Sequence, residues 1–253
     1  TLLFATDNEL WIGTESGAYI YNLRTGKYTH LRSSEYDPYS LSDNAIYSFC
    51  KDREDGIWIG SYFGGVNYYP RSYTHFEKYY PKGEENSLHG KRVREFCRDN
   101  YGVLWIGTED GGLNRFNLNT KEFSFFAPSA GFTNIHGLCL VDDKLWVGTF
   151  SKGLKIIDTR TGTVLKTYQK NSSPRSLIDN SIFAICRTAT GDIYLGTMFG
   201  LVKYNKQSDD FDRIPELNGK FVYDIKEDSG GNIWLATYAN GAYCYNVNDR
   251  KWK

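Results

Sequence analysis

Short apolar runs alternate with turn-forming residues along the whole chain. Residues 44–80 contain four runs of this kind, NAIYSFCKD, GIWIGS, GVNYYP and THFEKYY. The short connections in the chain, such as DREDG and NLRTGK, are rich in Asp, Asn and Gly, which suit the tight turns between antiparallel strands. The pattern therefore predicts groups of four short antiparallel strands, with longer connections such as YDPYSLSDN between the groups.

One phrase in the second run of each group recurs six times. It consists of an apolar residue, an aromatic residue, an apolar residue, Gly and Thr, with small variations. The six copies are LWIGT at 10–14, IWIGS at 57–61, LWIGT at 104–108, LWVGT at 145–149, IYLGT at 193–197 and IWLAT at 233–237. Their aromatic positions, 11, 58, 105, 146, 194 and 234, are 40 to 48 residues apart. This is the spacing of β-propeller blades, which is about 40 to 50 residues.

The second strand of each group has no polar face. Leu10 and Ile12 point to one side of the sheet and Trp11 and Gly13 to the other, so both sides need cover. Radial stacking of blades buries each side against a neighbour. We therefore expect the Trp residues of this phrase to be packing residues, and the glycine to leave room beside a large ring of an adjacent blade.

The predicted fold class is all-β, a β-propeller of six four-stranded antiparallel blades. The six blades are either a ring by themselves or part of a seven-bladed or longer array, and the single domain or fragment spans 1–253. The approximate blades are 1–34, 35–81, 82–129, 130–170, 171–215 and 216–253.

Composition narrows the range of partners. The chain has 253 residues, with 30 Lys and Arg against 30 Asp and Glu, and neither sign forms a block. We therefore expect no nucleic-acid partner and no anionic membrane surface. No apolar run approaches the roughly 20 residues of a spanning helix, and the first residues carry neither Met nor a signal sequence, so we expect a piece of a longer chain.

The cysteines and histidines do not form a metal or disulfide pattern. Four of the five cysteines occupy the same place near the end of successive first strands, where small buried hydrophobes are expected; they are Cys50, Cys97, Cys139 and Cys186. Cys244 stands alone in a third strand. The four histidines, His30, His75, His89 and His136, share no metal-ligand spacing, so solitary hydrogen-bonding roles are expected.

The acidic turn formed by Asp52, Glu54 and Asp55 suits tight-turn geometry better than calcium binding. We predict no metal, no cofactor and no catalytic residues, because the chain contains no G-x-S-x-G, P-loop or H-E-x-x-H motif.

Candidate ligand contacts lie in the loops after the Gly-Thr phrase, which a propeller places on one face. Aromatic side chains mixed with carboxylates, an amide and a lysine suit sugar rings, whose C–H faces stack and whose hydroxyls form hydrogen bonds. The candidates on this rim are Glu15, Tyr62, Phe63, Glu109, Asp110, Phe150, Lys152, Phe199, Tyr238 and Asn240. Others begin first strands near the expected channel mouth and could point inward: Arg92, Arg94, His136, Asn180 and Tyr223. The alternative is that the rim aromatics pack on neighbouring blades or on a second domain.

Several of these segments together resemble a known repeat. YSLSDN before a first strand, KDREDGIWIGSYFGGVNYYP and RDNYGVLWIGTEDGGLNRFN are similar to the two-component-regulator propeller repeats of periplasmic sensor domains in Bacteroidetes hybrid histidine kinases. The resemblance covers essentially the whole chain, although VDDKLW shortens one turn and Ala236 replaces the glycine of the last phrase.

The resemblance implies one or two propellers followed by a β-sandwich, a membrane helix and cytoplasmic kinase and regulator domains. It implies a periplasmic location, a homodimeric parent and an oligosaccharide ligand, and it fixes no ligand residues. The alternatives are a glycan-active propeller enzyme, a lyase or hydrolase using Glu15, Glu109 and Asp110, or a protein-binding scaffold.

Overall fold

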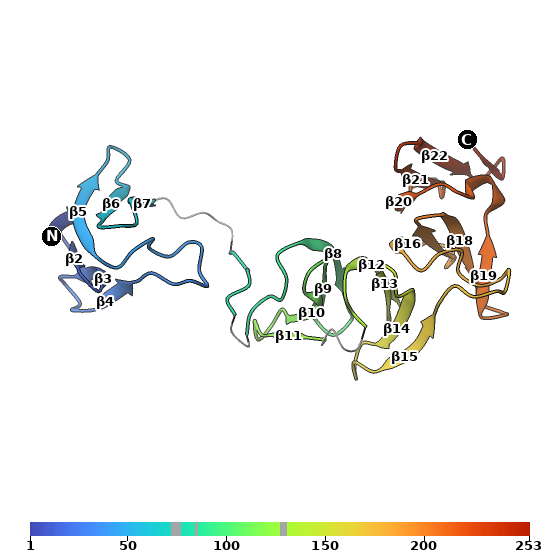
Figure 1. The fold of residues 1–253 in the computed structure, drawn as a ribbon, viewed down its shortest axis with the longest axis horizontal. Helices are drawn as coiled ribbons and strands as arrows, with labels where there is room; N and C mark the ends of the chain where they lie inside the picture. The colour runs from blue at the N-terminus through green and yellow to red at the C-terminus, as the bar shows by residue number, and fades with distance from the viewer. Residues whose placement is uncertain (72–76, 84–85, 127–130) are drawn as a thin grey trace. The chain divides into compact units, whose positions relative to one another are not determined.

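The computed structural model describes residues 1–71, 77–83, 86–126 and 131–253 and consists of small antiparallel sheets (Figure 1). Five sheets have four strands and one has three strands among the described residues. The strands of each sheet are neighbours in the order in which they follow in the chain. The prediction of an all-β fold with six antiparallel propeller blades is confirmed. The blades fall into two compact units, residues 1–83 and 84–253, and each is described by itself.

Unit 1 contains the first two blades. Blade 1 consists of β1 (Leu2–Thr6), β2 (Glu9–Thr14), β3 (Gly17–Asn22) and β4 (Tyr28–Leu31). Blade 2 consists of β5 (Ile46–Lys51), β6 (Ile57–Ser61) and β7 (Val66–Tyr69). The fourth strand expected at 74–80 lies partly outside the described residues, and the described part, 77–80, forms no strand.

Unit 2 contains four blades with four strands each. Blade 3 has β8 (Val93–Arg98), β9 (Val103–Thr108), β10 (Gly112–Asn117) and β11 (Phe123–Phe125). Blade 4 has β12 (Ile135–Val141), β13 (Lys144–Thr149), β14 (Leu154–Asp158) and β15 (Val164–Tyr168). Blade 5 has β16 (Ile182–Arg187), β17 (Ile193–Thr197), β18 (Gly200–Asn205) and β19 (Asp210–Arg213). After the 3-10 turn η2 (Pro215–Leu217), blade 6 has β20 (Val222–Glu227), β21 (Ile233–Thr237), β22 (Gly241–Asn246) and β23 (Lys251–Trp252).

The glycine of the repeated phrase makes room for the next blade. A Cβ atom on Gly107 would lie 2.6 Å from Cγ2 of Ile135, the first residue of the next blade. The corresponding contact would be 2.7 Å at Gly13 with Cγ2 of Ile46, at Gly148 with Cγ2 of Ile182 and at Gly196 with Cγ1 of Val222; these last two pairs lie in unit 2. The expectation of a large ring beside the glycine was wrong, because a β-branched side chain fills this space in each case.

The aromatic residue of the phrase faces the following blade of its unit. Trp105 is 0% exposed and packs in one cluster with Phe132 and Ile135. Trp11, Trp146 and Tyr194 are also buried. The expectation of burial on both faces is wrong for the last blade of each unit, where Trp58 and Trp234 are 45% and 48% exposed. Neither has a later blade of the same unit to cover its ring.

An aspartate in the first turn fastens the tryptophan ring in three blades. The carboxylate of Asp99 accepts hydrogen bonds from the backbone N–H groups of Tyr101 and Val103 and from the indole Nε1 of Trp105, at 2.8 to 2.9 Å. Asp52 and Asp228 bind their own turns and tryptophans in the same way. The hydrogen bond from Trp234 leads the contacts that lower the pKa of Asp228 to about 2. The acidic turns therefore hold the tryptophan ring as well as the backbone of the turn. The sequence predicted only the second role.

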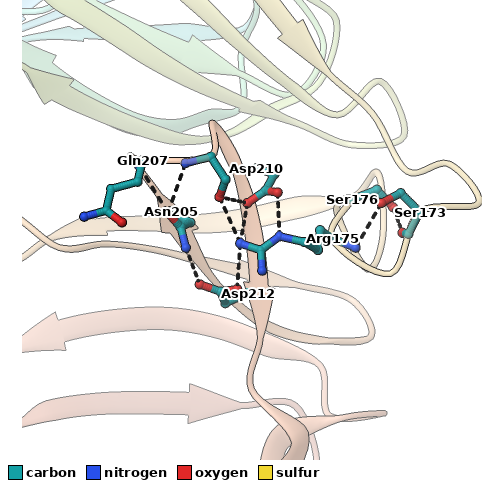
Figure 2. Close-up of polar contacts among 8 residues, drawn as sticks. Ser173, Arg175, Ser176, Asn205, Gln207, Asp210 and Asp212 are labelled. Atoms are coloured by element: carbon teal, nitrogen blue, oxygen red, sulfur yellow. Dashed lines mark hydrogen bonds and ion pairs between the residues drawn. The ribbon is translucent and has the colours of Figure 1, made fainter.

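Each of three connections between blades buries a leucine in the core. In the connection before blade 5, an arginine also binds a neighbouring strand. Leu177 of the loop before blade 5 is fully buried, and its counterparts Leu41 and Leu88 are 7% and 6% exposed. Figure 2 shows how Arg175 of this loop reaches β19. Its Nε and Nη2 donate to the two carboxylate oxygens of Asp210 at 2.5 and 2.7 Å, and Nη2 lies 3.1 Å from Asp212. This bidentate contact holds the pKa of Asp210 at about 2.

All five cysteines are free. Cys97, Cys139 and Cys186 are partly buried, and burial raises the pKa of the Cys97 thiol to about 12. Cys50 is exposed, so the expectation of a buried position was wrong for this residue. Among the described residues, no helix has the length and apolar character needed to span a membrane.

Candidate functional site

The first strand of five blades carries a local irregularity at one equivalent residue. In blades 2 to 6 the pairing with the second strand shifts by one residue near the start of the strand, as in a β-bulge. The shifted residues are Tyr47, Arg94, His136, Phe183 and Tyr223. A bulge leaves its extra residue out of the ladder and turns that side chain away from the regular alternation.

The loop after the second strand is fastened beside each bulge. The backbone N–H of Glu109 donates to the carbonyl of Arg92, which precedes the first strand, at 2.9 Å. The same bond joins Phe150 to Asn134 and Tyr238 to Phe221, also at 2.9 Å. The predicted rim loops and the bulged residues therefore lie at the same end of each blade. We call this end of a unit its mouth.

The mouth of unit 2 gathers aromatic side chains from three blades. Phe183 lies at its centre, with ring centroids 4.5 Å from His136, 4.4 Å from Phe221 and 5.8 Å from Tyr223. Phe150 contacts the same ring at 6.1 Å. Phe183 is buried, whereas Tyr223 and Phe150 remain exposed on one side. The cluster thus combines a buried base with an accessible aromatic surface.

Charged groups from blade 3 complete this mouth. Arg94 donates from Nη2 to the hydroxyl of Tyr223 at 2.6 Å, and its guanidinium lies 5.2 Å from the centre of that ring. Its Nε is 3.4 Å from Oε1 of Glu109, and Arg92 approaches the other oxygen of this carboxylate at 3.9 Å. The first and last blades of unit 2 are therefore linked at the mouth through Arg94 and Tyr223.

His136 is a buried member of the cluster. It is 6% exposed, its Nε2 lies 2.7 Å from Oδ1 of Asn134, and its Nδ1 has no hydrogen-bond partner among the described residues. Burial, followed by the positive charge of Arg94, lowers the pKa of His136. The ring is therefore neutral at pH 7, with Nε2 donating to Asn134.

The mouth of unit 1 is smaller and aromatic. Tyr47 and Tyr62 lie 5.0 Å apart, and Tyr62 and Phe63 lie 4.1 Å apart. The backbone N–H of Phe63 is held by the carboxylate of Asp43 at 2.9 Å, and the Phe63 side chain is 85% exposed. The backbone of Phe63 is therefore fixed while its ring is exposed, and packing in the folded state does not require an exposed aromatic ring.

The structure brings together six of the predicted candidates in unit 2: Arg92, Arg94, Glu109, His136, Phe150 and Tyr223. Tyr238 joins them through Phe221, with centroids 5.7 Å apart. In the same unit, Lys152, Phe199 and Asn240 are exposed and no side-chain contact joins them to this cluster among the described residues. Glu15 is exposed in blade 1 of unit 1.

Two candidates are engaged in holding loops. The carboxylate of Asp110 accepts from the backbone N–H groups of Lys91 and Arg92 at 3.0 to 3.1 Å. The side-chain oxygen of Asn180 accepts from the N–H of Lys170 at 2.7 Å, so this residue fastens a connection.

Sequence reasoning missed Tyr47, Phe183 and Phe221. Aligning the six phrases would have found the first two, because each follows the β-branched residue that packs against the glycine of the preceding blade. Phe221 directly precedes the β-branched residue Val222, and Arg92 stands at the equivalent position before Val93.

Two cavities lie away from the mouths, at equivalent places between neighbouring blades. One, of about 590 Å³, is lined by Trp11, Ile57 and Tyr69 of unit 1, and the other, of about 640 Å³, by Trp146, Ile193 and Tyr204 of unit 2. Their recurrence at the same junction position marks them as a consequence of blade packing. Among the described residues no group of three or more His, Cys, Asp or Glu side chains could hold a metal ion. His75 lies outside the described residues.

The chain matches one protein family and is similar to several solved structures. The family described as two component regulator propeller matches residues 40–63, 87–110 and 216–239. The chain is similar to a structure described as the extracellular domain of a hybrid two component system from B. thetaiotaomicron, with 24% identity and a TM-score of 0.56, covering 100% of this chain and 33% of that one. No curated protein sequence matches the chain.

Two further solved structures share the fold. PorZ, a surface component of the type-IX secretion system of Porphyromonas gingivalis, has 16% identity and a TM-score of 0.56, covering 100% of this chain and 40% of that one. A virginiamycin B lyase from Staphylococcus aureus has 11% identity and a TM-score of 0.50, covering 100% of this chain and 82% of that one. The chain thus spans about a third of the length of the B. thetaiotaomicron domain and two fifths of PorZ.

Proposed function

Starting from the two-component regulator propeller repeats that this chain carries, we propose that it is a non-catalytic, extracytoplasmic sensing module of a hybrid two-component histidine kinase. Its mouths bind an oligosaccharide released from a polysaccharide. In this proposal the domain lies in the periplasm and uses no cofactor.

The observation that carries the proposal is the contrast within each first strand. The residue before the bulge is Ile or Val in all five blades, and in blades 2, 4, 5 and 6 it packs against the glycine of the preceding blade of its unit. The bulged residue is different in kind from blade to blade, being Tyr, Arg, His, Phe and Tyr. One backbone shape thus presents varied side chains at one end of the blades, which is the arrangement expected of a recognition surface.

The chemistry of these side chains suits a sugar. Tyr47, Tyr223 and Tyr238 expose aromatic faces on which the C–H face of a pyranose can stack, and Arg92 and Arg94 offer donors to hydroxyl groups. The packing alternative accounts for Phe183, which is buried, and does not account for the exposed tyrosines.

Signalling requires that the ligand bind two arrangements of the receptor with different affinity. We propose that the parent is a homodimer and that an adjoining propeller or β-sandwich of the same parent chain passes the change onward. The ligand then shifts the equilibrium between two dimer arrangements.

The enzyme alternative assigned catalysis to Glu15, Glu109 and Asp110. Backbone hydrogen bonds from Arg92 and Lys91 outweigh burial and lower the pKa of Asp110, so this carboxyl is a poor proton donor at neutral pH. Glu109 lies between the guanidinium groups of Arg92 and Arg94, at 3.9 and 3.4 Å.

The test is a thermal-shift and calorimetric screen of the full chain against an oligosaccharide panel, with analysis of the sugar after incubation. We expect at least one oligosaccharide to raise the melting temperature and to be recovered intact. Tyr223→Ala should abolish the shift, whereas Tyr28→Ala, which changes an exposed tyrosine on the outer strand β4, should retain it. Recovery of a cleaved product would contradict the sensor proposal and favour an enzyme.

A further inference from the structure

We propose that the ligand bound at the mouth of unit 2 carries a negatively charged group, and that Arg94 is the residue that recognises it. This inference rests on the proposed function and adds the chemical class of the ligand. An acidic oligosaccharide, with a carboxylate or a sulfate on one of its sugars, is the molecule that fits.

The mouth of unit 2 has two guanidinium groups, those of Arg92 and Arg94, and only one carboxylate within the described part of the chain, that of Glu109, forms an ion pair with them. Arg92 and Arg94 share the single carboxylate of Glu109, at 3.9 and 3.4 Å, and neither distance is that of a close ion pair. Asp110, the next acidic residue, is occupied by two backbone N–H groups. The arginine pair therefore has room for a second anion.

Three other titratable groups lie near Arg94, namely Glu95, Asp224 and His136. Asp224 of β20 pairs with Lys226 at 3.4 Å, and Glu95 follows Arg94 on β8 in a half-buried position. His136 is neutral and contributes no charge. Glu95 and Asp224 directly follow the bulged residues Arg94 and Tyr223, and within the described part of the chain no hydrogen bond or ion pair joins either carboxylate to Arg94.

Arg94 has the geometry for bidentate recognition. Its Nη2 is held by the Tyr223 hydroxyl and its ring contact with Tyr223 fixes the plane of the guanidinium. Within the described part of the chain, no acceptor contacts its Nη1, and the side chain is 28% exposed. A planar guanidinium presents paired N–H donors that match the two oxygens of a carboxylate or sulfate.

The experiment compares matched charged and neutral sugars on the full chain by isothermal calorimetry. One pair is a galacturonate trimer and its carboxyl-reduced galactose counterpart. The second pair is a sulfated chondroitin disaccharide and its unsulfated counterpart, both with the carboxyl group reduced. The two pairs distinguish a carboxylate from a sulfate as the source of the charge.

Three variants locate the recognition. Arg94→Gln should weaken binding of the preferred acidic sugar by about 30-fold or more, as expected for loss of one partner of a charged hydrogen-bonded pair. Arg94→Lys, which keeps the charge and loses the fork, should recover only part of this affinity. Arg98→Gln changes an exposed arginine at the far end of the same strand and should leave the affinity unchanged.

The possible outcomes are distinct. Binding of an acidic sugar that depends on Arg94, with at least tenfold weaker binding of its neutral counterpart, supports the inference. Equal binding of a charged sugar and its neutral counterpart, or unchanged affinity in Arg94→Gln, overturns the inference and leaves the proposed function standing. If none of the four sugars binds, and a wider panel of neutral oligosaccharides binds instead, the inference is again overturned. Failure of every oligosaccharide overturns the proposed function together with it.

Discussion

Two neighbouring positions in the first strand of blades 4, 5 and 6 follow opposite rules. At the first position, Ile135, Ile182 and Val222 are fully buried and fill the space left by a glycine of the preceding blade. At the second position, the bulged residues differ in size, charge and exposure from one blade to the next. A shift of one residue in the ladder thus separates side chains that hold the blades together from side chains that are free to vary.

In this repeat protein, packing between blades restricts the first position and does not restrict the second. The junction residues must fit a space of fixed size, so they repeat. The mouth residues are set by a backbone irregularity that accepts many side chains, so their identity reflects what they contact.

The largest expected effect concerns the tryptophan of the repeated phrase. Trp105→Ala should lower the free energy of unfolding by about 3–5 kcal/mol, because the fully buried ring leaves a cavity between blades 3 and 4. Trp234→Ala, at the equivalent position of blade 6, should cost much less, since about half of that ring is exposed. Urea denaturation of the two variants measures the difference. Equal losses would mean that the following blade does not supply the burial.

A smaller effect is expected at the glycine of the junction. Gly148→Ala should cost about 1–3 kcal/mol, because the new Cβ would lie 2.7 Å from Cγ2 of Ile182 and 3.2 Å from its carbonyl oxygen. Gly60→Ala is the matched control, because the neighbour there is the hydroxyl of Ser48, which can rotate away. A double variant with Ile182→Ala should show coupling with Gly148→Ala in a double-mutant cycle, and strict additivity would argue against the contact.

The smallest effect concerns the carboxylate that holds the tryptophan of blade 6. The pKa of Asp228 is about 2 in the folded state, below its ordinary value of 3.8, so its contribution to stability is present above pH 4 and is lost as the pH falls toward 2. The melting temperatures of the unaltered chain and of Asp228→Asn should therefore converge between pH 4 and 2. A constant difference across this range would show that the titration of Asp228 does not affect stability.

Most of the fold could be predicted from the sequence, because one local pattern repeats. The six copies of the phrase set the blade count and the strand order, and the turn residues set the hairpins. What the phrase could not reveal is which neighbour covers it. Trp58 and Trp105 stand in almost identical sequences, and only the presence of a later blade in the same unit distinguishes their burial.

The candidate site could be predicted in part. Glu109, Phe150 and Tyr238 were found because they follow the phrase directly. Arg94, His136 and Tyr223 were predicted near the channel mouth, whereas Tyr47 and Phe183 at the equivalent bulged position were missed, because a β-bulge leaves no signature in the alternation of apolar and polar residues that would mark the five positions as one set.

The central claim is tested most directly by replacing two adjacent residues of β20 and measuring two quantities for each variant. Val222→Ala should lower the free energy of unfolding by about 2 kcal/mol and leave the affinity for the bound oligosaccharide within about twofold of the unaltered chain. Tyr223→Ala should lower the free energy of unfolding by only about 1 kcal/mol, because the partly exposed side chain loses one hydrogen bond and its ring contacts, and should abolish binding. If the two variants lose stability and affinity to the same extent, the bulge does not separate folding from recognition.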